Sequence, residues 1–557
     1  MTMRQPTSPW KAFRPGPLAA AIAVLAASAG AAEIEVSDPD MKVWWDNTVK
    51  YGAAARTSGQ SEALLGESNL DDGNRNFNRG LISNRLDWLS ELDIRRGNFG
   101  GRLSAAGWYD SVYNGRNDNP GFAGGGTPNQ SSVPYNAFTR EARDIHGSHA
   151  EVLDAFVYGR FDLAGQRASM RLGQHSIQWG ESLFFGGNAI AGTQSLIDAV
   201  KLQSVPNTPF KEAIRPVPQV SGQIEVAPNV TLGAYYQFQW KRNRLPAAGS
   251  YFSTVDMNPE GGEQILLPQA EQGGIFLDGN ITRAADQRAK NSGQGGLQLR
   301  FSDEETDYGA YLVRFHSKNF QQVSNLGVRS VIHAGPGGCV VPGSFSTGPA
   351  SCGMVVPRTY QLAWHEGITA LGLSASRTFG AINLAVEASV RHNQDLASTN
   401  SVNTQALGGP ATDNSGHPAY AIGNTAHVNL STLWQVPSTP LWQEATLAGE
   451  LAWNRVLKIT HNPDAVDSNA TRNAMSMRFV LEPTYRQVLP GLDIGVPIGL
   501  GYTPKSSRSM ALGPGGQPAS GGGDLSIGLN GAYLDVWRFS LSYTHYFGPE
   551  GHFLDAD

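Results

Sequence analysis

The first stretch of this sequence that could do chemistry is a run of oxygen-bearing side chains near residue 75. An amide or a carboxylate stands at every second position, in the order Asp72, Asn74, Asn76 and Asn78. Calcium loops space their oxygen ligands in this way, but they also need a downstream glutamate that this run lacks. Asn and Asp are in addition common turn residues because their side chains bond to nearby backbone. A structural turn is therefore the favoured interpretation, and a calcium site is the alternative.

The groups used by common enzymes are scattered along the chain. His146 and His149 could bind a metal, but the polar stretch around them offers no further ligand at the spacing that zinc sites use. The sequence contains no G-x-S-x-G elbow, no Walker phosphate loop and no H-E-x-x-H pair. We therefore expect no enzyme activity, no cofactor and no resident metal.

The N-terminal residues indicate export. A basic start is followed by an apolar run over 18–27 and by small residues at 29–31. This order is typical of a signal peptide, which we expect over 1–31 with cleavage after Ala31. The apolar run is too short to span the ~30 Å of a bilayer core.

The composition narrows the class of protein further. The chain has 65 glycines, 16% charged residues and a net charge of -6, so it lacks the basic surface expected of a nucleic-acid binder. After the N-terminal segment, no apolar run approaches the ~20 residues of a membrane helix. A membrane-spanning role would therefore require a β-barrel.

Strand-like alternation recurs along almost the whole chain. In 537–547 the apolar residues Trp537, Phe539, Leu541, Tyr543 and Phe547 share one face, and polar residues dominate the other. Seventeen such segments are expected: 45–55, 84–94, 99–110, 151–161, 167–178, 219–226, 230–240, 293–301, 307–316, 360–377, 381–392, 426–436, 444–456, 475–487, 492–501, 524–533 and 537–547.

Short turns alternate with long polar connections between these segments, which is the layout of an outer-membrane barrel. We therefore expect an all-β fold over 32–557: a transmembrane antiparallel β-barrel of about 16–18 strands with long extracellular loops. A soluble sandwich of sheets is the alternative. Because bacterial barrels normally have an even number of strands, we expect one strand to be missed or misassigned within 179–218 or 502–523.

Charged residues fall on the polar face of the expected strands, where a barrel would turn them toward its lumen. These are Arg85, Asp87, Glu91, Asp93, Arg102, Asp154, Arg160, Glu225, Glu387, Arg391, Glu450, Arg478, Glu482 and Arg486. Tryptophans near strand ends, at 45, 88, 240, 434, 453 and 537, suit the aromatic girdles of a barrel.

The connection 179–218 is long and mixes charge with apolar surface without alternating. Large barrels commonly narrow their lumen with an inward-folded loop, so this segment is a candidate constriction or plug. Its candidate residues are Trp179, Glu181, Asp198, Lys211, Glu212 and Arg215. The alternative is an outer loop packed against its neighbours.

The two cysteines of the chain lie in a Gly- and Pro-rich connection. Because an exported chain meets an oxidising compartment, we expect Cys339 and Cys352 to form one disulfide that pins this loop. A metal or catalytic thiol is the alternative.

Several stretches resemble one family in particular: 45–51 (WDNTVKY), 69–85, 171–181, 210–218, 235–244 and 533–548. Together they are similar to the proteobacterial outer-membrane family catalogued as domain of unknown function thirteen-oh-two. The resemblance implies an outer-membrane β-barrel. It also implies a periplasmic partner protein, an RND-type exporter and a small hydrophobic cargo such as a sterol or another lipid-like molecule.

The expected function is therefore an outer-membrane channel or transport component for a small hydrophobic or amphipathic molecule. A general diffusion porin and a plugged barrel that docks periplasmic partners are the alternatives. The strand 537–547 would serve as the C-terminal signal for the outer-membrane insertion machinery, followed by a short tail over 548–557. The expected location is the Gram-negative outer membrane, with the strands embedded in its lipid bilayer after signal-peptide cleavage.

Overall fold

The computed structural model describes residues 32–121, 131–204, 213–257, 259–266, 280–331, 344–348, 351–513 and 519–549. The expected signal peptide, Lys211, Glu212, Cys339 and most of the C-terminal tail lie outside these residues. The predictions for them, including the Cys339–Cys352 disulfide, therefore stay predictions. Among the described residues, no helix combines the length and apolar character needed to cross a membrane.

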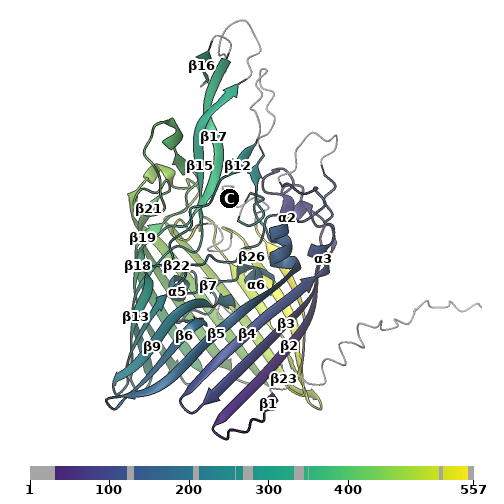
Figure 1. The fold of residues 1–557 in the computed structure, drawn as a ribbon. Helices are drawn as coiled ribbons and strands as arrows, with labels where there is room; N and C mark the ends of the chain where they lie inside the picture. Colours follow the sequence, from purple (N-terminus) through teal and green to yellow (C-terminus); the bar gives the residue numbers. More distant parts are fainter. Residues whose placement is uncertain are drawn as a thin grey trace, which may run out of the picture.

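One large antiparallel sheet of nineteen strands forms the wall of the molecule (Figure 1). Its strands are β1 (Ala32–Ile34), β2 (Met41–Arg56), β3 (Gly80–Arg96), β4 (Phe99–Asp110), β5 (Ser148–Leu163), β6 (Gln166–His175), β9 (Val217–Ala227), β10 (Val230–Gln237), β13 (Gln294–Ser302), β14 (Thr306–Phe315), β18 (Ile368–Phe379), β19 (Ile382–Asp395), β21 (Ile422–Val436), β22 (Glu444–His461), β23 (Asn473–Leu489), β24 (Leu492–Gly495), β25 (Ile498–Tyr502), β26 (Gly523–Tyr533) and β27 (Trp537–Phe547). Each long strand pairs with the next along the chain, so the sheet winds round as a barrel-like wall.

Turns of two or three residues, such as 97–98, 164–165 and 228–229, lie at one end of this wall. The long connections lie at the other end. They carry α2 (Asp72–Arg75), α3 (Ser111–Asn114), α4 (Arg140–Ala142), the π-helix η2 (Arg143–Gly147), the 3-10 turns η4 (Gln405–Leu407) and η5 (Pro463–Ala465), and a second sheet of β11 (Gln264–Ile265), β12 (Ile281–Arg283), β15 (Gln321–Val331), β16 (Ser344–Gly348), β17 (Ser351–Ala363) and β20 (Val402–Asn403). In Figure 1, β15, β16 and β17 project beyond the wall at this end.

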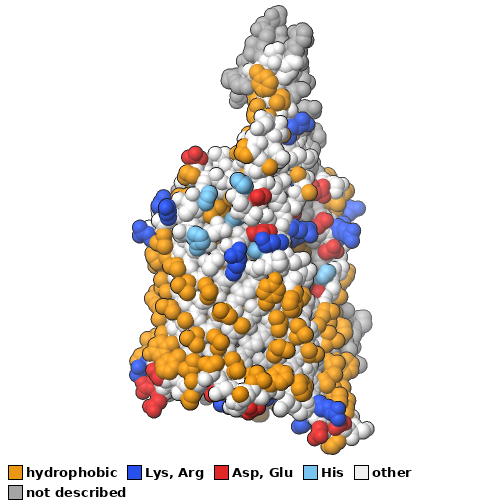
Figure 2. All heavy atoms as spheres, turned by 60° about the vertical axis from the view of Figure 1, so that its left-hand side comes forward, with side chains coloured by type: hydrophobic (Ala, Val, Ile, Leu, Met, Phe, Trp, Pro, Cys, Tyr) orange, Lys and Arg blue, Asp and Glu red, His pale blue; other side chains and the backbone are white. Residues whose placement is uncertain are grey.

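The two faces of the wall differ as the alternation predicts. On β18, Leu371 and Leu373 are 56% and 63% exposed, whereas Ala370 and Ser374 beside them are 0% and 7% exposed. Figure 2 shows the result on one side of the molecule, as a belt of apolar side chains over the strands. Because the apolar faces point outward and are uncovered, the arrangement is the reverse of a soluble sandwich.

The strand assignment from sequence needs two corrections. The segment 360–377 is two strands: β17 belongs to the second sheet, and β18 to the wall. The sequence predicts a single strand here because both strands alternate and only four residues, 364–367, separate them. Trp240 lies beyond the end of β10 and packs on Trp364 in a buried cluster, so it is not part of an outer girdle.

The wall contains one strand that the sequence did not predict, the three-residue β1, and it lies outside both 179–218 and 502–523. β24 and β25 lie end to end between β23 and β26, so seventeen long strands remain beside the short β1. β1 pairs with β2 on the side away from β3 through three residue pairs. A strand of three residues is too short to show alternation.

β27 is the last strand of the wall and runs from the short-turn end toward the long-connection end. Its apolar residues Trp537, Phe539, Leu541, Tyr543 and Phe547 are 37–73% exposed. Among the described residues, β27 pairs with β26, and no pairing joins β27 to β1 or β2. Closure of the barrel at this seam therefore stays a prediction.

Candidate functional site: a segment clamped inside the wall

The connection between β6 and β9 does not stay outside the wall. Its described first part, residues 176–204, is here called the inner segment and contains α5 (Ala191–Gln194), β7 (Leu196–Ile197) and α6 (Ala199–Ser204). Figure 1 shows α5, β7 and α6 within the ring of strands. β7 pairs with β8 (Ile214–Arg215) as the chain returns to the wall.

Two buried glutamates on the wall hold the inner segment by its backbone. Glu450 on β22 accepts the N–H groups of Leu183 at 3.2 Å, of Phe184, and of Phe185 at 2.8 Å. Glu387 on β19 accepts the N–H of Glu181 at 2.7 Å and that of Ile190. Hydrogen bonds to a carboxylate are roughly twice as strong as neutral ones, and both side chains are 1–2% exposed. Backbone N–H groups of residues 181–190 therefore surround two carboxylates of the wall, much as the N–H groups of an anion-binding loop surround a bound anion.

Arg391 on β19 completes the clamp by binding the carbonyl groups of the same stretch with a positive charge. Its guanidinium donates to the carbonyl oxygens of Gly187, Asn188 and Ala189 at 3.1, 3.0 and 3.0 Å. Arg391 is 4% exposed. Backbone donors and acceptors of one short stretch are thus bound by carboxylates and a guanidinium from β19 and β22, which fixes the position of that stretch.

The side chain of Asn188 anchors the tip of the segment. Its Nδ2 donates to the carbonyl oxygens of Val428 and Trp453 at 3.2 and 3.1 Å and to Asn429 Oδ1 at 2.8 Å. Its Oδ1 lies 3.0 Å from His427 Nδ1 and accepts from Asn454 at 3.1 Å. The amide therefore uses both ends on β21 and β22, and only Asn or Gln offers that combination.

Glycine makes room for this close approach. Gly180 has a φ of +93°, and a Cβ there would lie 2.1 Å from Glu387 Oε2. Gly372 on β18 faces Ile190, whose Cδ1 would lie 2.5 Å from an added Cβ. Larger residues at either position would push the inner segment off the wall.

Residues on either side of the clamped stretch 181–190 contact β10 and the connection that follows β14. Trp179 packs on Tyr235 of β10, with ring centroids 5.0 Å apart. The carbonyl oxygen of Gln194 accepts from Gln237 at 2.8 Å, and that of Thr193 accepts from Lys318 Nζ at 3.0 Å. Burial and the nearby Arg391 lower the pKa of Lys318 to about 7. The segment therefore extends along the inner wall from β10 to β22 and occupies part of the interior.

Two further candidates of the 179–218 connection, Asp198 and Arg215, lie apart from the clamp. Asp198 accepts from Arg244 at 2.9 Å, and Glu151 accepts from both Arg244 and Arg215 at 2.7 and 2.9 Å. Glu181 joins the clamp through its backbone N–H, whereas the ring of Trp179 packs on Tyr235. The ion pairs of Glu151 and Asp198 thus connect residues 198 and 215 with β5, which carries Glu151.

Of the charged strand residues singled out from the sequence, the structure brings Glu387, Arg391 and Glu450 together at the inner segment. The others pair locally or stand free of it. The pairs are Arg102 with Glu91, Asp93 and Asp154; Arg85 with Asp87; Glu225 with Arg167; Arg478 with Asp524; and Arg486 with Glu444 and Asp493. Glu482 accepts from Asn530 at 3.3 Å, and Arg160 is exposed.

Sequence reasoning missed five members of the site: Asn188, His427, Asn429, Asn454 and Lys318. One signal was available. In β21, Thr425, His427, Asn429 and Ser431 stand at every second position, and all four are buried. A polar face that is buried inside a strand wall indicates that something polar covers it.

Comparison with known proteins gives one family and several distant structures. The sequence model of the family described as "Protein of unknown function (DUF1302)" matches residues 14–557. A search of curated protein sequences finds no match.

Solved structures with a similar arrangement include Salmonella typhi OmpF in complex with daunomycin, at 7% identity and a TM-score of 0.34, covering 92% of this chain and 100% of that one. The outer membrane channel DcaP of Acinetobacter baumannii matches at 9% and 0.33, covering 90% and 97%. Pseudomonas aeruginosa OccD3 (OpdP) matches at 9% and 0.36, covering 94% and 89%. At these values the likeness carries no information on function.

Proposed function

This chain belongs to the family described as Protein of unknown function (DUF1302), and we propose that it is an outer-membrane channel whose lumen is narrowed by the inner segment. The uncovered apolar belt supports a lipid-embedded wall, because such a belt is costly in water and favourable in a bilayer. A barrel of 16–18 strands is wide enough to leave an aqueous channel. The proposed location is the Gram-negative outer membrane.

The observation that carries the proposal is the clamp at Glu387, Arg391 and Glu450. Isolated buried charges are unfavourable, so a wall that only needed stability would not carry three of them on the inward faces of β19 and β22. Here all three bind backbone groups of the inner segment. Their role is therefore to fix a loop across the interior, which is how a barrel sets the width and selectivity of its pore.

The inner segment offers both charge and apolar surface to the interior. Leu183, Phe184 and Phe185 are half-buried, as is Glu181. Such a mixture suits a small amphipathic or hydrophobic molecule better than a simple ion. The resemblance seen in the sequence adds a periplasmic partner and an RND-type exporter as the proposed companions of the channel, and the insertion machinery as the receptor of β27.

Single-channel recording of the purified, folded chain in planar bilayers tests the proposal. We expect discrete current steps that a hydrophobic or amphipathic molecule reduces at lower concentration than a polar solute of equal size. Ohmic steps without such discrimination would favour a general diffusion porin. Intact folding without any current would overturn the channel and favour a plugged barrel that docks partners.

A further inference from the structure

Three aspartates from two distant connections meet at the long-connection end of the wall. Asp71 and Asp72 lie at the start of α2, between β2 and β3, and Asp256 lies between β10 and β13. One carboxylate oxygen from each lies within 4.8 Å of the other two. Asp71 and Asp256 are 1% and 3% exposed. Like charges this close and this dry repel strongly unless a cation lies between them.

The surroundings explain why these carboxylates are buried. Leu70, Val255 and Met257 flank the aspartates in sequence and share one apolar cluster with Ile281 and Tyr360. Two hydrogen bonds hold the connections together: Asp256 N donates to the carbonyl oxygen of Asn69 at 3.0 Å, and Asp72 N donates to the side-chain Oδ2 of Asp256 at 3.1 Å. The packing of the connections therefore forces the carboxylates together.

The charges within the cluster do not balance. Arg75 pairs with Asp71, and no ion pair to Asp72 or Asp256 occurs in the described part of the chain. Asp256 Oδ1 is buried with no hydrogen-bond partner among those residues. An orphaned anionic oxygen in a dry site is the mark of an absent positive ligand.

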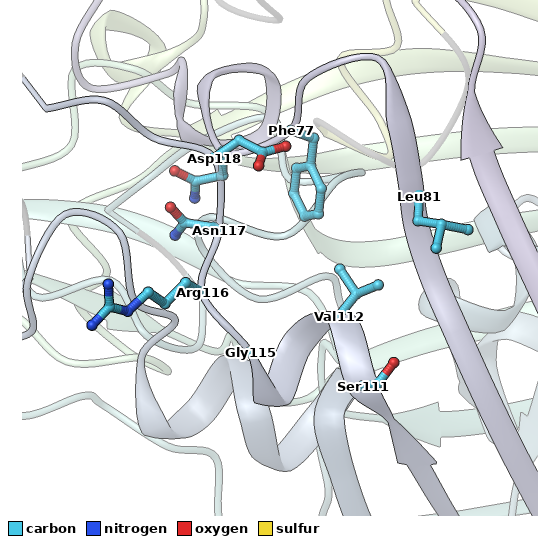
Figure 3. Close-up of a pocket in the computed structure, with 9 residues that line it drawn as sticks. Phe77, Leu81, Ser111, Val112, Gly115, Arg116, Asn117 and Asp118 are labelled. Atoms are coloured by element: carbon cyan, nitrogen blue, oxygen red, sulfur yellow. The ribbon is translucent and has the colours of Figure 1, made fainter.

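Space for an ion adjoins the cluster. A cavity of about 20 Å³ is lined by Asp72 and Asp256 together with Asn76, and one water-sized particle needs about 10–15 Å³. The larger neighbouring pocket of about 180 Å³ (Figure 3) is less suitable. Its carboxylate, Asp118, already accepts the N–H of Asn78 at 2.9 Å, and Phe77 and Val112 line the rest.

We propose that Asp71, Asp72 and Asp256 bind one Ca²⁺ ion that joins the connection after β2 to the connection after β10. The ligands are all oxygen, which favours a hard cation over zinc or copper. Ca²⁺ accepts irregular sets of carboxylates and amide oxygens, whereas Mg²⁺ demands a near-ideal octahedron and retains its waters. Asn119 lies behind the three ligands, and its Nδ2 is 3.4 Å from Asp72 Oδ1.

This site differs from the loop that the sequence suggested. Asn74 binds Arg56 through its Oδ1 at 2.6 Å, and Asn76 donates to Gly249 O at 2.9 Å, so both amides are engaged elsewhere. Asp72 alone is shared, and Asp256 comes from 184 residues further along the chain. The proposal goes beyond the channel function and does not depend on it. Because β2 and β10 lie far apart in the wall, the ion would brace connections across the mouth.

Titration of the full, folded chain in detergent with CaCl₂ after removal of metal by EDTA tests the site. We expect one ion per chain with a Kd between ~10⁻⁵ M, the weak end of the sensor range, and ~10⁻³ M, the weak end of the extracellular range. Asp256→Asn and Asp72→Asn should each weaken binding at least ~10-fold by removing a charged ligand. The control is Asp144→Asn, since Asp144 is an exposed carboxylate of a neighbouring connection, 3.8 Å from Arg140; it should bind as the unmodified chain does.

Melting temperatures give a second readout, because Asp256→Asn should shift the melting temperature in opposite directions with and without Ca²⁺. In EDTA, Asp256→Asn should melt higher than the unmodified chain because it removes repulsion between buried carboxylates. In CaCl₂ it should melt lower because the ion loses a ligand. A folded unmodified chain that neither binds nor is stabilised at about 10 mM Ca²⁺, well above the weakest such sites, would overturn the proposal. Equal loss of binding in Asp144→Asn would overturn it too, and if Asp256→Asn does not fold, Asp72→Asn serves both readouts.

Discussion

Replacing Glu450 by alanine should free the inner segment from the wall. The substitution removes the acceptor of three backbone N–H groups, at Leu183, Phe184 and Phe185, and the partner of Asn429 Nδ2 at 2.7 Å. Hydrogen bonds to a charged group contribute about 1.5–3 kcal/mol each, and bonds that share one acceptor do not add fully. A loss of about 3 kcal/mol for the docked position is a conservative figure, and it changes the ratio of docked to undocked segment on the order of 100-fold.

The consequence is measurable as current. In planar bilayers, Glu450→Ala should give larger or more strongly flickering single-channel steps than the unmodified chain, because the segment no longer occupies a fixed position. Glu450→Gln should fall between them, since a neutral acceptor is about half as strong. Glu225→Ala is the matched control: Glu225 lies on β9, accepts from Arg167 at 3.0 Å and has no bond to the inner segment among the described residues. Steps of equal size and noise in folded Glu450→Ala and unmodified protein would refute the clamp.

Three further predictions concern the site and the wall. Gly180→Ala should disturb the current as Glu450→Ala does, because its Cβ would meet Glu387 Oε2, whereas Gly187→Ala, with nothing within 4 Å, should not; both are read by single-channel recording. Leu373→Arg, at a position 63% exposed on the apolar belt, should lower the free energy of unfolding in lipid vesicles by up to about 2–4 kcal/mol, measured by urea titration; an unchanged value would place this face outside the membrane. Lys318 binds fewer protons folded than unfolded between its lowered pKa of about 7 and its ordinary value of 10.5, so its contribution makes stability rise with pH over that range. The rise, measured as unfolding midpoints at several pH values, should be smaller in Lys318→Met, and parallel curves would contradict the shift.

Much of the wall follows from local pattern. Strand alternation needs only neighbours in sequence, so the segments 99–110 and 537–547 coincide with β4 and β27. β1 could not be predicted because three residues are too few to show strand alternation. Its assignment rests on pairing with Val43, Trp44 and Trp45 of β2.

The site is harder to predict because its partners are distant in the chain. Charge on a strand face marks Glu387, Arg391 and Glu450 as unusual, but not what they bind. Asn188 meets its partners on β21 and β22 about 240–266 residues later, and nothing local to Asn188 indicates which strands it will reach. The same holds for Asp256, whose connection lacks the oxygen-rich spacing around Asp72. Only the fold, which brings these strands and connections round one interior, makes such contacts visible.

We propose that the inner segment lies in the conducting path. Gly187 is at the tip of that segment, and a Cβ there meets open space, so Gly187→Cys should leave the fold intact. A bulky charged thiol reagent added during single-channel recording should then reduce the current of Gly187→Cys in one step and leave the unmodified chain unaffected. Labelling of the introduced thiol confirmed by mass spectrometry, with no change in current, would contradict the claim.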